Sequence, residues 1–477
     1  MNLSDGLLKA LDTTSKVEKK VETTNTKAYE LYLKAKHKYE KRENTDDTDV
    51  ARKLLYQAIE LDDSLIAAKV LLGLTYSQMG DYDEAMKIYT PALEQAEKLD
   101  DKNGIVNSLN NIGVVSHYKG QYDKALDCYY RSLEIRQEIG DTHGIGVVLG
   151  NIGFLYANKG QYDTALEYYE RSLKIQEEIG NEKGIGVSLG SIGNLYEVKG
   201  EYDQALKYYN RSLNIRKEIG DTPGLGYSLN SIGNLLEIKG EHTKALDYLN
   251  RSLAIKKELG DKYGMGQTLG CIGIVQMSKG EYENALEHHE ESLAIKEEIG
   301  DTRGIGYNLN IIGDLHYNTG HYEKALEYFN RPIKIFNEIG DKVGMGYSLN
   351  SIGLVHYNRG EYNRAEDSLE KSLAIQKEIV LRTRELETTT YLYLCYRHLS
   401  KEYDKQDIHS LIKEAENIEY EINFRLYQLL DDTSYLETAY KQVQEKASEM
   451  KEETGNTFLG YPLPAAIIQE YNKVLNN

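Results

Sequence analysis

The chain has 477 residues and carries 57 Lys and Arg against 76 Asp and Glu, a formal net charge of −19. This acidic balance argues against a nucleic-acid backbone or an anionic membrane surface as the main partner, because both would repel the protein. The three cysteines, Cys128, Cys271 and Cys395, are far apart, which favours neither a disulfide framework nor a zinc site and indicates a reducing compartment.

The first residues contain only a short apolar patch mixed with charges, "MNLSDGLLKALDTTSKVEKK". This pattern matches neither a secretory signal nor a membrane span, which needs about 20 apolar residues in a row. We therefore expect residues 1–26 to form an N-terminal capping helix or linker of a cytoplasmic protein. Residues 27–63 then form an irregular first repeat, with Ala51 and Ala58 at the small-residue places of its second helix.

Between residues 64 and 380 the sequence repeats itself every 40 residues. The stretch "GDTRGIGYNLNIIG" from Gly300 suggests a phosphate-binding loop, but close copies begin at Gly140, Gly180, Gly220, Gly260 and Gly340. A phosphate loop occurs once in a fold, after a strand. A self-similar period of this length instead indicates stacked units, not the roughly three separate domains that the length alone would suggest.

Each 40-residue unit predicts two helices. In residues 140–179 the first half has an apolar face at i, i+3, i+4 and i+7, which predicts a helix that we call helix A. The second half predicts helix B, which ends at Gly180, where a left-handed cap forms easily. Gly153 on A and Ala165 on B remove bulk where the two helices of an antiparallel hairpin approach, and Asp141 can cap the next helix A.

The same grid of small residues marks eight regular units over residues 64–380. The helix A glycines are Gly73, Gly113, Gly153, Gly193, Gly233, Gly273, Gly313 and Gly353, and the helix B alanines begin at Ala85 and end at Ala365. The order Leu-Gly-x-x-Tyr, then Ala, then an aromatic residue resembles the tetratricopeptide repeat. The 40-residue period, with "LNNIG" from Leu109 and "RSLEIR" from Arg131, resembles the long-repeat type of kinesin light chains and Pins-like spindle-orientation adaptors. This resemblance implies an all-α, right-handed superhelical solenoid of antiparallel helix hairpins.

Past residue 380 the glycine grid stops. Residues 381–477 predict degenerate C-terminal helical repeats and a cap. The charged stretch "KQVQEKASEMKEE" supplies the polar outer face that the last unit of a solenoid needs.

The resemblance also implies a binding groove, because helix A lines the concave face in this repeat family. Asparagine is a poor helix former, so its concentration on helix A lacks a local reason. A carboxamide can pair with any peptide backbone, and tyrosines add contact area; the alternative is that the asparagines solvate an exposed face or bond to neighbouring helices. The candidate peptide-binding residues are Asn110, Asn111, Asn151, Asn194, Asn230, Asn234, Asn310, Asp314, Asn318, Asn350, Asn358, Tyr227, Tyr307, Tyr317, Tyr347, Tyr357, Glu197 and Glu237.

The charged residues along the predicted groove indicate which charges a ligand can carry. Glu197 and Glu237 make its middle acidic, which favours a basic residue in the ligand. The groove positions of helix A hold no ring of Lys or Arg, which argues against a clamp for a terminal carboxylate.

Catalytic and metal sites are not expected. His288 and His289 lack the H-E-x-x-H order of a zinc helix, and His289, His316 and His356 occupy packing positions. Cys271 has no matching His-Asp arrangement. We expect no cofactor, no metal and no enzymatic activity.

These features predict a non-catalytic protein–protein interaction scaffold that binds an extended peptide or a partner helix in its concave groove. The alternative is a regulatory or sensory module that controls a separate cyclase, kinase or transcription regulator, because the first repeat resembles those that follow such domains. The partner is a protein or peptide, not a nucleic acid or a membrane. The sequence does not indicate the oligomeric state.

Overall fold

A computed structural model describes residues 25–40, 45–379, 384–415, 417–448, 450 and 452–475. The capping helix or linker predicted for residues 1–26 lies almost wholly outside this part. Helices and turns account for the described residues, which include no strand, so the all-α prediction is confirmed.

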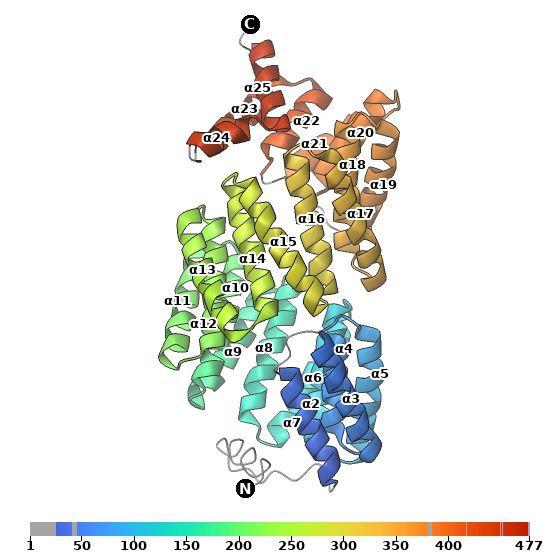
Figure 1. The fold of residues 1–477 in the computed structure, drawn as a ribbon, viewed down its shortest axis with the longest axis vertical. Coiled ribbons are helices and arrows are strands. Elements are labelled where there is room, and N and C mark those ends of the chain that lie inside the picture. Colours follow the sequence, from blue (N-terminus) through green and yellow to red (C-terminus); the bar gives the residue numbers. More distant parts are fainter. Residues whose placement is uncertain are drawn as a thin grey trace. The chain divides into compact units, whose positions relative to one another are not determined.

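The chain divides into two compact units, residues 1–140 and residues 141–477. In the first unit, consecutive helices pair as hairpins (Figure 1). Its described helices are α2 (Thr26–Glu40), α3 (Thr45–Leu61), α4 (Ile66–Ser77), α5 (Tyr82–Lys98), α6 (Lys102–Tyr118) and α7 (Tyr122–Glu138).

The second unit is a solenoid of hairpins in which even-numbered helices are helix A and odd-numbered ones helix B up to α19. The regular helices are α8 (Thr142–Asn158), α9 (Tyr162–Glu178), α10 (Glu182–Val198), α11 (Tyr202–Glu218), α12 (Thr222–Ile238), α13 (His242–Leu259), α14 (Lys262–Ser278), α15 (Tyr282–Ile299), α16 (Thr302–Asn318), α17 (Tyr322–Ile339), α18 (Lys342–Asn358) and α19 (Tyr362–Glu378). The C-terminal helices are α20 (Glu385–His398), α21 (Lys405–Glu414), α22 (Tyr420–Leu430), α23 (Thr433–Ser448), α24 (Glu452–Leu459) and α25 (Pro462–Leu475).

Glycine and aspartate set the helix ends as the sequence predicts. Gly160 and Gly180 adopt φ of 72° and 65°, a left-handed conformation that glycine adopts without steric cost. The Asp141 carboxylate accepts a hydrogen bond of 2.9 Å from the Gly144 amide and so caps α8. The turns between hairpins therefore follow from local chemistry.

The regular spacing of glycine on helix A allows an aromatic ring of helix B to lie against its backbone. A Cβ atom added at Gly193 would stand only 2.6 Å from the ring of Tyr209, and Ala205 beside it is fully buried. The prediction that these small residues permit a close approach is confirmed.

The Gly-x-Gly pair at the start of helix A also has a packing role. The ring of Phe336 on α17 fills the space between Gly306 on the preceding helix A and Gly344 on the following one; added Cβ atoms would stand 2.7 and 2.6 Å from it. The motif that resembles a phosphate loop therefore accommodates a long side chain of helix B.

A serine on helix B bonds to helix A in most regular hairpins of the second unit. The hydroxyls of Ser172, Ser212, Ser252, Ser292 and Ser372 donate to the carbonyls of Gly146, Gly186, Gly226, Gly266 and Gly346 over 2.6–2.8 Å. Each bond fixes the register of its hairpin.

We expect Ser252→Ala to lower the free energy of unfolding by about 1 kcal/mol, because the buried bond is lost with little change in volume. Urea denaturation would measure the loss. Ser410→Ala removes an exposed hydroxyl that bonds within its own helix α21, and it should change stability by less than about 0.5 kcal/mol. Equal effects of the two changes would contradict a register role for Ser252.

Candidate functional site

One face of helix A recurs through the second unit. Residues spaced i, i+3, i+7 and i+10 share one side of a helix. On α10 they are Val187, Gly190, Asn194 and Glu197. We call this side, with the equivalent positions of α8, α12, α14, α16 and α18, the A face.

The A face of α8 to α14 exposes large apolar side chains. Val147 is 44% exposed, Phe154 50%, Val187 53%, Tyr227 45% and Ile274 40%. Sequence reasoning identified Tyr227 but missed the other four, although they stand at the same repeat offsets as the predicted asparagines and tyrosines. Exposed apolar side chains that gather on one face of a protein make that face a candidate for contact with a partner.

The structure brings the predicted polar residues of α10 together. The Tyr209 hydroxyl lies 2.5 Å from Oδ1 of Asn194 and 2.6 Å from Oε2 of Glu197. Glu197 is half-buried, and this burial raises the pKa of its carboxyl group. On α12, Glu237 accepts a hydrogen bond of 2.8 Å from the Ser278 hydroxyl of the next helix A.

Three predicted asparagines bridge successive A helices. Their side-chain oxygens accept hydrogen bonds of 2.8–2.9 Å from a hydroxyl on the next helix A: Asn230 from Thr268, Asn310 from Ser348, and Asn350 from Thr388. Asn310 and Asn350 are only 2% and 1% exposed. In this structure they realise the alternative role that the sequence left open, a bond to a neighbouring helix.

The other asparagines at the N-terminal end of the predicted groove are half-buried. Asn110 and Asn111 lie on α6 of the first unit, where the Asn111 amide donates to the Asn107 carbonyl over 2.8 Å. Asn151 lies on α8 of the second unit, and Asn234 lies on α12 close to the thiol of Cys271.

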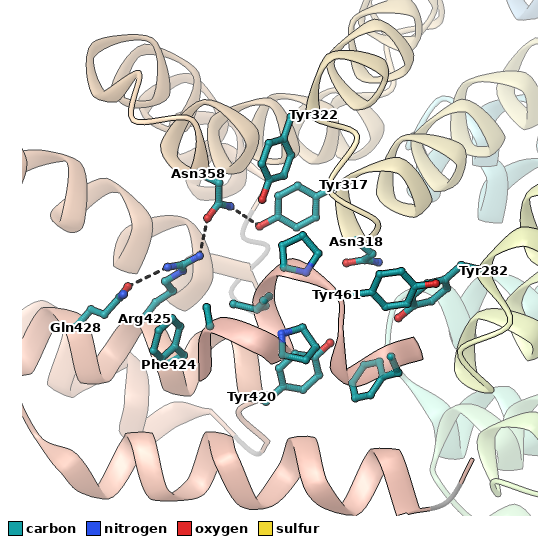
Figure 2. A pocket seen from close by; sticks show the side chains of 15 residues that line it. Tyr282, Tyr317, Asn318, Tyr322, Asn358, Tyr420, Phe424, Arg425, Gln428 and Tyr461 are labelled. Carbon is teal, nitrogen blue, oxygen red and sulfur yellow. Dashed lines mark hydrogen bonds between the residues drawn. The ribbon is translucent and has the colours of Figure 1, made fainter. Parts of the chain in front are cut away.

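The A face of α16 and α18 is covered by the chain's own C-terminal part. Helix α22 packs on α20 and inserts Arg425, which is 7% exposed. Figure 2 shows its guanidinium directed at Asn358, whose oxygen accepts a bond of 2.6 Å, while the Asn358 amide donates to the Tyr317 hydroxyl over 2.7 Å. Tyr317 in turn donates to Glu421 of α22 over 2.8 Å.

The remaining predicted residues of this end are also engaged. The Tyr307 hydroxyl donates to Asp341 over 3.0 Å, and the Tyr347 hydroxyl donates to Asp314. Tyr357 is 8% exposed and lies under the Arg425 guanidinium, 5.2 Å from its ring centre. The predicted C-terminal third of the groove is therefore an intramolecular interface in this structure.

A family model described as "Tetratricopeptide repeat" matches residues 64–138, 104–178, 144–218, 184–258, 264–338 and 307–378. These matches cover more than half of the chain. The chain belongs to the tetratricopeptide repeat family. This confirms the resemblance inferred from the glycine and alanine grid, and membership indicates a protein-interaction scaffold.

Solved structures similar to this tetratricopeptide repeat protein have low sequence identity to it. Aspartyl phosphate phosphatase F from Bacillus subtilis is 15% identical, with 73% of this chain and 92% of that chain covered and a TM-score of 0.47. A signal transduction ATPase with a tetratricopeptide repeat sensor from Pyrococcus horikoshii is 17% identical (76% and 55% covered, TM-score 0.46). Kinesin light chain-like repeats from Podospora anserina are 15% identical (40% and 95% covered, TM-score 0.35). No curated protein matches the chain significantly.

A cavity of about 280 Å³ lies between the repeats of this tetratricopeptide repeat protein and its C-terminal helices. The repeats contribute Tyr282, Tyr317, Asn318, Tyr322 and Asn358 (Figure 2). The C-terminal part contributes the other lining residues, among them Tyr420, Phe424, Arg425, Phe458 and Tyr461. The rings of Tyr282, at the start of α15, and Tyr461, just before α25, pack 4.9 Å apart, so the C-terminal part also contacts the hairpin of α14 and α15. Asn318 lines this cavity and not an open groove.

Two carboxyl groups beneath the covered A face have raised pKa values. Burial raises the pKa of Asp314 to about 7, against the lowering effects of the Tyr347 hydroxyl and Arg384. Burial likewise raises the pKa of Glu387 to about 7, with Arg384 opposing and Glu421 adding to the rise. The folded protein therefore holds these protons more tightly than the unfolded chain does.

This difference predicts that stability falls as the pH rises. A raised folded-state pKa contributes stability fully below about pH 4, and the contribution is lost as the pH rises through about 7. We expect the combined Asp314→Asn and Glu387→Gln variant to gain stability relative to the wild type at pH 8 but not at pH 5. Urea denaturation at both pH values would measure this, and a constant difference between the two proteins would contradict it.

The described residues contain no group of three or more His, Cys, Asp or Glu that could hold a metal ion. His289 is fully buried, its Nδ1 atom lies 2.9 Å from Asn308, and burial lowers its pKa to about 4. Its predicted packing role is confirmed. Among the described helices, none is long and apolar enough to cross a membrane.

Proposed function

We propose that this protein is a non-catalytic scaffold that binds an extended peptide or a partner helix along the A face of α8 to α14. The observation that carries the proposal is the line of exposed apolar side chains there, which includes Phe154, Val187 and Tyr227. A soluble ligand would shield these side chains from water, at roughly 25 cal/mol per Å² of apolar surface buried.

The polar residues between them suit a peptide backbone. Asn194 is exposed, and Asn151 and Asn234 are half-buried on neighbouring A helices. A carboxamide can donate to a peptide carbonyl and accept from a peptide amide. Glu197 and Glu237 lie on the same helices and would favour a basic residue in the ligand. Among the described residues, no convergent acid, base and nucleophile supports an enzyme.

A selection of displayed peptides against the full chain tests the proposal. We expect enrichment of peptides whose binding falls at least tenfold in the variant Phe154→Asp with Asn234→Ala. The matched control is Asn330→Ala on α17, where an exposed asparagine bonds only to the Leu326 carbonyl of its own helix. Binding that survives the double change, or no enrichment by folded protein, would overturn the proposal.

A second candidate is a regulatory module whose ligand competes with the C-terminal helices for the A face. The observation that favours it is the insertion of Arg425 and Glu421 between groove residues of α16 and α18. The module would switch an effector elsewhere when α22 is displaced. Hydrogen exchange of residues 420–430 with and without a selected peptide separates the two: a regulatory module exchanges faster with ligand, and a scaffold does not.

A further inference from the structure

The cavity beneath the C-terminal helices has room for a small molecule. Its lining residues come from positions 282–358 of the repeats and positions 420–466 of the C-terminal part. Its volume of about 280 Å³ is close to the lower end of the range of about 300–1,000 Å³ typical of small-molecule sites. A cavity of about 150 Å³ already holds benzene, so this one can hold one or two fused rings. It is partly open to solvent, and exposed Pro462 lines it, so a ligand can enter from the surface.

The two walls of this cavity are held against each other at several points. A Cβ atom added at Gly320, in the turn after α16, would stand 2.8 Å from Cγ of Pro462. One added at Gly280, in the turn after α14, would stand 2.9 Å from Sδ of Met450. The bond from Arg425 to Asn358 is a third contact between the C-terminal part and the repeats. The space between the walls therefore has a defined shape.

Aromatic rings form much of the wall. Seven of the 15 lining residues are Tyr or Phe, against 9% aromatic residues in the whole chain. Figure 2 shows Tyr317 and Tyr322 on one side of the site and Tyr420 on the opposite side. Tyr420 and Phe458 meet edge to face, with ring centres 6.3 Å apart. Because aromatic rings attract one another in edge-to-face and offset-stacked arrangements, this wall favours a flat aromatic ligand.

Several polar groups of the wall have no hydrogen-bond partner among the described residues. The Tyr461 hydroxyl is buried and unpaired. The half-buried Asn318 carboxamide and the hydroxyls of Tyr322 and Tyr420 also make no hydrogen bond to a described residue. Carboxamides and hydroxyls both donate and accept, and such groups are normally paired when buried. They can therefore pair with a hydroxyl or carbonyl group of a ligand.

The charge of the wall is already balanced within the protein. Of the described residues that line the cavity, only Arg425 is charged, and it donates to Asn358 and to Gln428 over 2.9 Å. The Glu421 carboxylate, which accepts from the Tyr317 hydroxyl, lies within electrostatic reach of the guanidinium. A charged ligand would lose its hydration without gaining a counter-charge of its own, so the cavity favours an uncharged one.

We propose that this cavity binds an uncharged aromatic small molecule of one or two rings that carries a hydroxyl or carbonyl group. The ring lies between the aromatic side chains of the repeats and those of the C-terminal part, and its polar group pairs with the Asn318 carboxamide. The site is separate from the A face of α8 to α14 and takes a different class of ligand from the peptide proposed there. Because both walls contact the ligand, its binding holds α22 in place.

Probes of similar size test the ligand class. They are 2-naphthol, the anion 2-naphthoate, the cation 2-naphthylmethylammonium and the saturated alcohol decahydro-2-naphthol. Isothermal titration calorimetry with the full chain at pH 7 should give a Kd below about 1 mM for 2-naphthol, at least about tenfold tighter than for either charged probe. We expect 2-naphthol to bind at least about threefold tighter than the saturated alcohol, because only 2-naphthol makes aromatic contacts.

Variants locate the site. Ala466→Phe on α25 places a ring in the cavity, so we expect it to abolish the binding of 2-naphthol. The matched control is Ala465→Phe, because this half-exposed neighbour does not line the cavity. Asn318→Ala removes an unpaired carboxamide and breaks no hydrogen bond between described side chains, and it should weaken binding about three- to tenfold. Circular dichroism would verify that all three variants fold.

Hydrogen exchange tests whether the ligand contacts both walls. If only the docked arrangement binds 2-naphthol, a concentration of about ten times the Kd should slow the exchange of amides in residues 420–430 about tenfold. Ala466→Phe should show no such slowing. Unchanged exchange in the wild type at saturating 2-naphthol would overturn the placement of the ligand beside α22.

The outcomes separate this inference from the proposed function. The cavity site is overturned if no probe binds the folded wild type, or if 2-naphthol binding survives Ala466→Phe. A charged probe that binds as tightly as 2-naphthol would overturn the uncharged ligand class. Phe154→Asp, which alters the proposed peptide surface, should leave 2-naphthol binding unchanged, so the failure of one proposal does not decide the other.

Discussion

Replacing Arg425 with Met will release helix α22 from the A face of α16 and α18. The guanidinium is 7% exposed and donates to Asn358, to the Tyr391 hydroxyl over 3.0 Å and to Gln428 over 2.9 Å. Without it, the half-buried Glu421 carboxylate keeps only the hydroxyls of Tyr317 and Tyr391 as donors among the described residues. Removing one partner from a buried charged network costs about 3–5 kcal/mol.

Hydrogen exchange would measure this release. We expect amides of residues 420–430 to exchange at least a hundredfold faster in Arg425→Met, since about 2.7 kcal/mol of local stability corresponds to that factor. Arg397→Met is the matched control, because that side chain is 45% exposed and its ion pair with Asp431 contributes at most about 1 kcal/mol. Unchanged exchange in Arg425→Met would show that α22 is held by other contacts.

Release of α22 would also change the binding surface. Two of the candidate binding residues of the sequence analysis are hydrogen-bonded to α22. Tyr317 donates to Glu421, and Asn358 accepts from Arg425. In Arg425→Met they become available, and the open A face extends from α14 towards α18. A peptide that binds the variant more tightly than the wild type would support the regulatory alternative.

Gly193→Ala and Gly190→Ala, three residues apart on α10, will change stability in opposite directions. A Cβ at Gly193 would stand 2.6 Å from the Tyr209 ring, which cannot retreat because its hydroxyl is held by Asn194 and Glu197. Such overpacking costs about 1–3 kcal/mol. At Gly190 the nearest atoms are 3.9 Å away, so alanine should stabilise the helix by about 0.5–1 kcal/mol.

Urea denaturation of the two variants and the wild type would measure the change in the free energy of unfolding caused by each substitution. The helix-propensity gain is common to both substitutions, so the difference between the variants isolates the steric contact with Tyr209. Combining Gly193→Ala with Tyr209→Ala should remove the clash penalty and leave only the cost of the lost ring. Equal effects of the two alanines would contradict the close packing of the hairpin.

Local chemistry accounts for the part of the fold that the sequence predicts well. The 40-residue grid places glycine where Tyr209 packs and aspartate where Gly144 is capped, and each rule acts within one hairpin or between neighbours. The limits proposed for the terminal regions, residues 1–26 and 381–477, remain predictions because the grid does not extend to them.

The candidate site was predicted less completely. Periodicity correctly selects helix A positions, but it cannot distinguish exposed Asn194 from Asn350, which is 1% exposed and bonded to Thr388. It also overlooks Phe154 and Val187, because apolar residues in a helical pattern are usually core. The apolar pattern of helix B likewise does not reveal that a basic residue such as Lys256 reaches the A helices on either side of it.

The sequence by itself determined the hairpin, its period and its family, because short-range packing repeats wherever the same small residues recur. Only the tertiary structure decided which repeats keep an open A face, since that depends on Arg425 of α22 meeting Asn358, 67 residues earlier in the chain. It also decided that the Lys256 ammonium meets the Asn230 oxygen on one A helix and the Thr268 hydroxyl on the next. These outcomes depend on contacts between different repeats, and no pattern within one repeat encodes them.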